Sequence, residues 1–298
     1  MSTKKFAAFV VTFNRAEILM DTIHKIFTQT VPPEKLLVVD NGTTDETKKK
    51  LDELYPEVAY IKMGYNAGPA GGDKVGLEIL ANEGYEWIFW GDDNDPPPTQ
   101  DTFEKLLLLA EANKNNCGQV GMVGSRFNKL TGLLQRASNE ELRENAYIEV
   151  DTIGGGQCKI VNAKSILNGV LPEAKLFFGF EDLDFDLSQK KAGYRILVHS
   201  DLFLNCRERW DRLNVPNKVA RKKDERVLWR DYYSIRNALF IMKKHRHYLA
   251  FLSILMVSFG KSILSFKHGF RYGTLVTKNT CKAVRDYGLS RYYKSSTV

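Results

Sequence analysis

The chain has 298 residues, of which 43% are hydrophobic and 27% charged, so it is long enough for one large domain or a core domain with an appendage. This balance excludes a disordered protein. The net charge is +7, and residues 261–298 carry eight Lys and Arg against one acid, Asp286. Such a basic segment suits an anionic partner or is a solvated face. It contains no nucleic-acid-binding motif, so we expect no nucleic acid and favour a membrane surface.

The four cysteines lie far apart and form no CxxC pair. This pattern argues against a zinc site or a disulfide framework and is typical of the reducing cytosol. The stretch MSTKKFAAFVVTFNR predicts no signal peptide, because its apolar run is short and strand-like.

The first part of the chain alternates strand-like and helix-like segments. Apolar, β-branched runs predict strands at 6–13, 35–42, 58–64 and 85–93, and periodic runs predict helices at 15–29, 44–55 and 99–113. A glycine-rich turn at 65–76 leads into a further helix through 77–84. This alternation predicts an α/β fold, a Rossmann-like, mostly parallel sheet flanked by helices. Ligands of such sheets bind at the carboxyl ends of the strands, where Asn14, Asp40, Asn66 and the acids of 92–95 are expected.

The remaining sequence is less regular. We expect strands within 118–127 and 158–163, a loop entering a short helix at 178–194, and a charged loop at 211–226. A helix at 227–245 begins a helical C-terminal section, and we divide the chain into 1–225 and 226–298.

Segment 248–266 is nearly all apolar but is interrupted by Gly260 and Lys261. A membrane span needs about 20 apolar residues without a central charge, so we do not expect spanning. A helix lying in the membrane interface fits the flanking basic residues. A core helix or a dimer-interface helix is the alternative, and homo-oligomerisation stays open.

The stretch WGDDNDPPP places Asp92, Asp93 and Asp95 at the end of an apolar strand. Adjacent carboxylates repel one another unless a cation neutralises them, and oxygen ligands suit Mg²⁺ or Mn²⁺. The prolines end the strand, and Pro96 holds Asp95 extended. The alternative is an acidic turn that caps the next helix.

Three further features are candidates for binding or catalysis. Asp40 can accept hydrogen bonds from a base or a ribose, although Asp-Asn-Gly also forms turns. The stretch NAGPAGG offers unobstructed backbone amides but lacks both the GxGxxG and the GK[ST] patterns. The stretch FGFEDLDFDL contains four acids, one of which can act as a general base, while Asp184 or Asp186 can stabilise the start of a helix.

Five segments together resemble the inverting family 2 glycosyltransferases of the GT-A fold, in that family's order: FVVTFNR, VVDNGTTD, NAGPAGG, WGDDNDPPP and FGFEDLDFDL…AGYRI. The chain is most similar to bacterial galactofuranosyltransferases and rhamnosyltransferases, which build cell-surface polysaccharides. The segment WRDYYSIRNALF at 229–240 is similar to one that those enzymes carry after the catalytic domain. The resemblance covers about residues 5–244.

The resemblance implies a set of site residues. Those expected around the nucleotide and sugar are Thr12, Asn14, Arg15, Asp40, Asn66, Gly68 and Gly72. Asp93 and Asp95 match the metal-binding pair, with Asp92 and Asn94 as the alternative register. Asp182, preceded by Glu181, matches the catalytic base. The family's metal-binding His falls on Asn205 or Cys206, so His199 is the nearest candidate for a third ligand, unless it is an ordinary strand residue.

The implied reaction is a direct displacement, in which the base deprotonates an acceptor hydroxyl and Mn²⁺ or Mg²⁺ offsets the charge on the leaving diphosphate. UDP-galactofuranose is the favoured donor and dTDP-rhamnose its rival, with a lipid-linked glycan as acceptor at the cytoplasmic face of the membrane. Two alternatives are a catalytically silent nucleotide- or glycan-binding module and a nucleotidyltransferase. The retained acids argue against the first, and the absence of a basic, glycine-rich phosphate loop near the N-terminus argues against the second.

Overall fold

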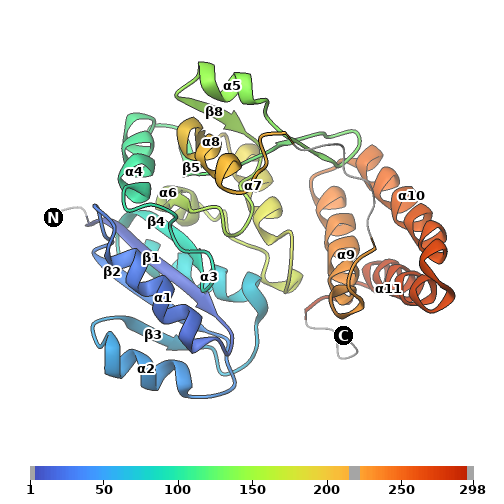
Figure 1. Cartoon of the computed structure of the whole chain (residues 1–298), viewed down its shortest axis with the longest axis horizontal. Helices are drawn as coiled ribbons and strands as arrows, with labels where there is room; N and C mark the ends of the chain where they lie inside the picture. Colours follow the sequence, from blue (N-terminus) through green and yellow to red (C-terminus); the bar gives the residue numbers. More distant parts are fainter. Residues whose placement is uncertain (1–3, 215–221, 294–298) are drawn as a thin grey trace.

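The structure, a computed structural model, describes residues 4–214 and 222–293 and is built on an eight-stranded sheet (Figure 1). The strands in spatial order are β3 (Ala59–Lys62), β2 (Lys35–Asp40), β1 (Lys4–Thr12), β4 (Tyr85–Asp92), β9 (Lys159–Asn162), β5 (Cys117–Gly121), β10 (Arg195–His199) and β8 (Tyr147–Val150). Only β9 and β8 run antiparallel to their neighbours within this sheet. The predicted mostly parallel α/β sheet is confirmed.

Helices cover both faces of the sheet, because alternate residues of each strand point to opposite sides. Along β1, Phe6, Ala8 and Val10 belong to one core cluster. That cluster includes residues of α1 (Ala16–Phe27), α2 (Glu46–Leu54), α4 (Thr102–Ala112) and α8 (Ser200–Arg209). The intervening residues of β1 belong to the opposite cluster, with α3 (Gly68–Asn82), α6 (Ala163–Leu167) and α7 (Glu181–Lys191). The short helix α5 (Asn139–Glu144) and a two-stranded hairpin, β6 (Arg126–Phe127) with β7 (Leu134–Gln135), complete this part of the chain.

The glycine-rich segment differs from its prediction, because α3 already begins at Gly68 and most of the expected turn is helical. A Cβ atom on Gly72 would lie 2.8 Å from Cγ1 of Val11, and one on Gly76 would lie 2.4 Å from Cδ2 of Phe9. These glycines therefore let the helix approach β1 closely, and Pro69 suits a first helical turn, where its missing N–H is not needed.

Strand register brings the expected strand ends together. Thr12 pairs with Asp40, and Val11 pairs with Asp92, so the carboxyl ends of β1, β2 and β4 lie side by side. This edge of the sheet carries the residues for which the sequence predicts ligand contacts.

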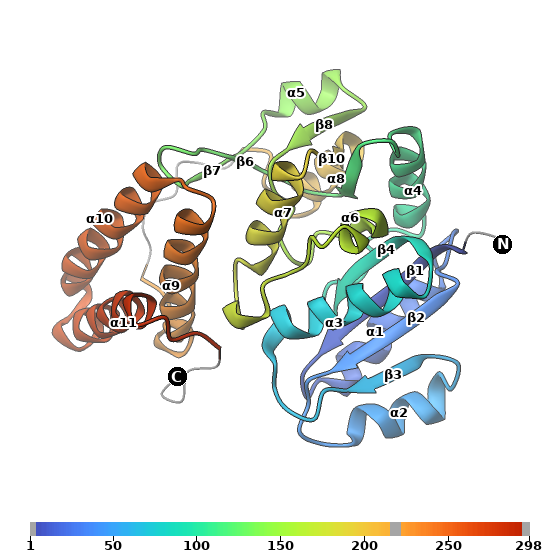
Figure 2. The ribbon, with the colours of Figure 1, turned by 180° about the vertical axis from the view of Figure 1, so that it is seen from behind.

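The C-terminal helices α9 (Trp229–Lys244), α10 (Tyr248–Ser265) and α11 (Phe270–Gly288) form a unit beside α7 (Figures 1 and 2). The 3-10 turns η2 (Glu225–Val227) and η3 (Phe266–His268) flank these helices. The predicted helical C-terminal region is confirmed, whereas the division after residue 225 stays a prediction. Residues 215–221 of the predicted charged loop lie outside the described residues.

Candidate active site

Asp93 is a buried anchor of the acidic loop. Its side chain is 0% exposed, and its Oδ2 accepts a hydrogen bond of 2.8 Å from the Thr12 hydroxyl. Its Oδ1 lies 2.6 Å from Nη2 of Arg15, and the Thr22 hydroxyl donates to its backbone carbonyl. Burial raises the pKa of Asp93 to about 6, against the opposing effect of the Thr12 hydrogen bond. In this structure the Asp93 carboxylate faces Thr12 and Arg15, so the assignment of Asp93 to the metal pair stays a prediction and the alternative register with Asp92 is the more accessible one.

Asp92 and Asp95 are the acids of this loop that remain available. The Asp92 side chain is 47% exposed, and Oδ2 of Asp95 lies against Gly156, where a Cβ would come within 2.2 Å. Burial raises the pKa of both carboxyls, and the charge of Asp92 raises that of Asp95 further. Arg15 is 4.0 Å from Asp92 and offsets this charge only in part. Two desolvated carboxylates with oxygen donors suit a hard divalent cation that takes its other ligands from phosphate and water.

The structure places the predicted third metal ligand, His199, away from the acidic loop, and its role as a ligand stays a prediction. His199 ends β10, three strands from β4 in the sheet, which at about 4.8 Å per strand is roughly 14 Å away. The charges that shift its pKa belong to Asp201, Lys105 and Asp101, after the main effect of burial, which lowers it. Asn205 is exposed on α8. In the ranges 4–214 and 222–293, no three His, Cys, Asp or Glu side chains gather as a metal site.

Asp182 lies in the first turn of α7 and faces a glycine loop. Its Oδ2 accepts a hydrogen bond of 2.5 Å from the backbone N–H of Gly155, and its Oδ1 accepts one of 2.9 Å from Leu183. The three glycines at 154–156 thus contact Asp182 at one position and Asp95 at another. The sequence analysis missed this loop, although a run of three glycines between two strands was a readable signal.

A buried charge cluster lies behind these acids. Burial, followed by the charge of Asp182, raises the pKa of Glu181 to about 8, so Glu181 is largely protonated at pH 7. Burial and the charge of Glu181 raise the pKa of Asp73 well above its usual range. Lys159, 1% exposed, lowers the pKa of both acids and lies 3.5 Å above the Trp90 ring centroid. The sequence analysis overlooked Asp73 and Lys159, although a lysine inside an apolar strand was a signal.

The two remaining acids of α7 have structural partners. Asp184 is 0% exposed and binds Nζ of Lys244 at 2.6 Å and Nε2 of His245 at 3.0 Å. Asp186 accepts hydrogen bonds from the side chain of Gln119 and from the backbone N–H of Ile153, which precedes the glycine loop. Burial raises the pKa of Asp186 to about 7. Neither acid caps α7, whose N-cap is Phe180.

The proposed nucleotide side is a rim built from β1, β2 and α3. Asn14 adopts a positive φ of 53° and accepts a hydrogen bond from the Thr43 N–H. Asp40 is 0% exposed and accepts from the Gly42 N–H at 2.6 Å and the Tyr60 hydroxyl at 2.9 Å, so a base or ribose could reach its carboxylate only if neighbouring groups moved.

The glycines and amides at the start of α3 have separate roles. The Asn66 side chain accepts from the Gly68 N–H, and Gly68, with φ of 72°, lies against the Phe177 carbonyl, which a Cβ would approach to 2.1 Å. Asn41 joins this segment to β2 by donating to the Gly68 carbonyl and accepting from the Ala67 N–H. Gly72 packs on Val11 near the end of β1, and its expected place beside the ligand stays a prediction.

The segment WRDYYSIRNALF clamps the loop that leads to Asp182. The Asn237 side-chain amide donates to the carbonyls of residues 176, 178 and 179 at 3.0, 3.0 and 2.8 Å. Arg236 donates to the same Leu176 carbonyl at 2.8 Å, and both side chains are 0% exposed. The clamped loop contains Phe177 and Phe180 at positive φ of 64° and 66°, a strained conformation that needs such support.

Comparisons with known proteins bear on the family and the fold of this chain. The sequence profile described as "Glycosyl transferase family 2" matches residues 7–167. Galactofuranosyltransferase GlfT1 of Mycobacterium tuberculosis is 29% identical over 213 residues, which are 67% of this chain and 66% of the relative. The chain thus spans about two thirds of the length of that relative.

Two solved structures share the fold. Staphylococcus aureus TarS 1-349 in complex with UDP-GlcNAc has a TM-score of 0.57 and 15% identity, covering 95% of this chain and 80% of that one. Mannosyltransferase PcManGT from Pyrobaculum calidifontis, in complex with GDP-Man and Mn2+, has a TM-score of 0.55 and 13% identity, covering 96% and 88%. Both are similar in fold to this chain, and the predicted GT-A architecture is confirmed.

Replacing Asn237 with Ala tests the clamp. The carbonyls of residues 178 and 179 lose their Asn237 donor, whereas that of Leu176 keeps Arg236, and the loss should cost about 1–3 kcal/mol of unfolding free energy. Because the loop positions Asp182, we expect kcat to fall about tenfold or more while the donor KM stays within about twofold. Urea unfolding and steady-state kinetics measure the two effects.

The matched control is Asn279→Ala, which removes a 2.9 Å hydrogen bond to the Leu228 carbonyl, away from the loop. It should lower stability without lowering kcat. Equal kcat losses in both variants would show that Asn237 stabilises the protein generally and does not specifically position Asp182.

Proposed function

Because this chain belongs to glycosyl transferase family 2, and is therefore a glycosyltransferase, we propose that it inverts the anomeric centre as it moves galactofuranose from UDP-galactofuranose to a lipid-linked cell-surface glycan. The observation that carries the mechanism is the glycine loop at 154–156, which contacts Asp182 through Gly155 and the partly buried Asp95 through Gly156. The choice of galactofuranose rests on the similarity to galactofuranosyltransferase GlfT1.

In the proposed reaction, Asp182 accepts the proton of the acceptor hydroxyl through one of its carboxylate oxygens. Each of these oxygens already holds one backbone N–H, which fixes the carboxylate, and keeps a lone pair for the proton. The acceptor oxygen attacks the anomeric carbon from the side opposite the departing nucleoside diphosphate. Arg15 at the strand end is placed to meet phosphate oxygens. Mn²⁺ or Mg²⁺ held by Asp92 and Asp95 would supply Lewis-acid stabilisation of the diphosphate charge.

Changing Asp182 to Asn tests the assigned base. The amide cannot take the proton, so kcat should fall by about 10²–10⁴-fold while UDP binding is retained. A panel containing UDP-galactofuranose and dTDP-rhamnose, with Mn²⁺ and a lipid-linked acceptor, measures turnover, and calorimetry measures UDP binding. Asp201→Asn, at an exposed position on α8, is the matched control, and this variant should turn over normally. Undiminished transfer by the Asp182 variant would refute the assignment.

Substitutions in the acidic loop at 92–95 distinguish the proposed metal ligands from the buried Asp93. Asp92→Asn and Asp95→Asn should each weaken Mn²⁺-dependent UDP binding about tenfold or more, because each removes a proposed oxygen ligand. Asp93→Asn should instead lower the free energy of unfolding by about 2 kcal/mol, since it weakens the charge-assisted contacts with Thr12 and Arg15. Calorimetry with and without Mn²⁺, together with urea unfolding, distinguishes them. The reverse pattern would restore Asp93 as the ligand.

We also propose that α10 holds the enzyme on the inner face of the cell membrane. Its side chains at 249, 252, 256 and 263 follow a helical spacing and are 61%, 55%, 76% and 73% exposed. By length and composition, Tyr248–His268 could cross a membrane, and 22% of its apolar window is buried. The exposed basic residues Lys261, on α10, and Lys267 and Arg271, shortly after it, suit anionic headgroups. The paired apolar and basic character favours a lipid surface over a second copy of the chain.

Vesicle co-sedimentation of the full chain tests this face. The double variant Leu252→Gln, Met256→Gln should bind vesicles containing anionic lipid about tenfold more weakly, because two apolar side chains leave the interface. Leu108→Gln, on α4 and 65% exposed, is the matched control and should bind like the unchanged protein. A concentration-dependent dimer in light scattering that dissociates in the double variant, without vesicle binding, would assign the face to a second copy instead.

A further inference from the structure

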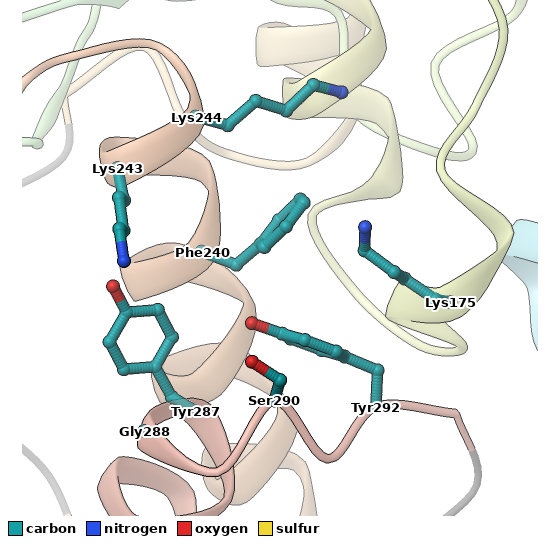
Figure 3. Close-up of a pocket in the computed structure, with 8 residues that line it drawn as sticks. All are labelled: Lys175, Phe240, Lys243, Lys244, Tyr287, Gly288, Ser290 and Tyr292. Atoms are coloured by element: carbon teal, nitrogen blue, oxygen red, sulfur yellow. The ribbon is translucent and has the colours of Figure 1, made fainter.

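A pocket of about 640 Å³ lies where the end of α9 meets the chain that follows α11 (Figure 3). Its charged and aromatic lining residues are Lys175, Lys243, Lys244, Phe240, Tyr287 and Tyr292. Among residues 4–214 and 222–293, no carboxylate lines it. A volume of this size lies within the range of small-molecule sites in proteins.

The three lysines of the pocket differ in their partners. Lys244 points away toward α7 and pairs with Asp184 at 2.6 Å, and Lys175 pairs with Glu173 at 3.3 Å (Figure 3). Lys243 forms no ion pair with a carboxylate within residues 4–214 and 222–293, and its Nζ lies 6.0 Å from the Tyr287 ring centroid. Lys243 therefore leaves uncompensated positive charge beside aromatic and hydroxyl groups, a combination that suits an anion.

The chain segment after α11 forms one wall of the pocket, and several contacts hold it in place. The N–H of Tyr293 donates to the Lys175 carbonyl at 2.8 Å, and Arg236 donates to the Tyr293 carbonyl at 3.1 Å. The Tyr292 ring packs on Phe240 with centroids 5.3 Å apart. Arg236 also donates to the Leu176 carbonyl in the clamped loop at 176–179, so the same buried side chain holds both the pocket wall and that loop.

The pocket lies between the beginning of α10 and α7, the helix that carries Asp182. On one side, the Tyr287 ring packs against Phe251 of α10, with centroids 5.5 Å apart. On the other, Lys175 directly precedes the clamped loop at 176–179, and Lys244 binds Asp184, two residues beyond Asp182. An amphiphile whose chain follows α10 would place its headgroup here.

We propose that this pocket binds the phosphate or diphosphate group of the lipid that carries the glycan acceptor. The inference rests on the proposed function, and it adds a residue, Lys243, and a headgroup chemistry to the acceptor side of the site. Phosphate oxygens accept charge-assisted hydrogen bonds from lysine, and the tyrosine hydroxyls can donate further ones. Held there, the lipid would be anchored on the acceptor side while its sugar reaches Asp182.

Calorimetry on the full chain with farnesyl diphosphate tests the pocket, with EDTA present so that the metal-dependent donor site does not contribute. Lys243→Gln should weaken binding about tenfold or more, because one charge-assisted contact is lost. Lys243 is exposed and forms no ion pair within the described chain, so this variant should fold normally. Lys278→Gln, an exposed lysine on α11, makes the same change in net charge and should stay within about twofold of the unchanged protein.

Two further ligands identify the source of the phosphate. Farnesol should bind much more weakly than farnesyl diphosphate, and inorganic diphosphate should also bind more weakly. Inorganic diphosphate binding as tightly as the prenyl compound would overturn the lipid assignment. Absence of farnesyl diphosphate binding, or binding that Lys243→Gln leaves unchanged, would overturn the pocket itself.

Donor binding is measured separately, as UDP binding with Mn²⁺ and as UDP-galactofuranose hydrolysis. If the protein binds and hydrolyses the donor but does not bind farnesyl diphosphate, the proposed lipid-phosphate site is wrong and the proposed function is unaffected. A chain that binds farnesyl diphosphate through Lys243 but processes no nucleotide-sugar refutes the function instead.

Discussion

Repulsion among carboxylates governs the architecture of this site. Two clusters of acids, at the end of β4 and at the start of α7, lie around one glycine loop, and like charges at such distances cannot all stay ionised without partners. The structure resolves part of the conflict by giving two of the buried acids cationic partners, and burial raises the pKa of others, such as Glu181 and Asp73. Asp93 has Thr12 and Arg15, whereas Asp184 has Lys244 and His245.

The acids that remain are those the proposed chemistry needs. Asp92 and Asp95 stay open toward the strand ends, and Asp182 is held only by backbone N–H groups. Behind them, Lys159 is a buried cation whose Nζ has no hydrogen-bond partner in the described chain. Its charge limits how far burial raises the pKa of Glu181 and Asp73. The division between structural and reactive acids is thus set by which partners the fold brings near each one.

That division explains what the sequence could and could not predict. The alternating apolar strands and helices follow from local periodicity, and the strand ends follow from a parallel sheet, so the fold class and the edge that bears the site were predictable. The choice between Asp92 and Asp93 was not, because Thr12 and Arg15 come from β1 and the start of α1, about 80 residues earlier. The distance of His199 from the acidic loop was unpredictable for a similar reason, since the sequence does not reveal that two strands separate β10 from β4. The glycines of α3 read locally as a turn, and only packing on Val11 and Phe9 makes them helical.

The C-terminal helices support the candidate site as well as any attachment to a membrane. Arg236 and Asn237 hold the loop before Asp182, and Lys244 holds Asp184 on the same helix as Asp182, the proposed base. The helix that supplies these contacts, α9, leads directly into α10, whose apolar face is exposed. If α10 lies on a lipid surface, as proposed, the short rigid path through α9 fixes the direction in which Asp182 faces that surface. A lipid-linked acceptor would then meet Asp182 in one orientation, because α9 connects the membrane-bound α10 to the contacts that position Asp182.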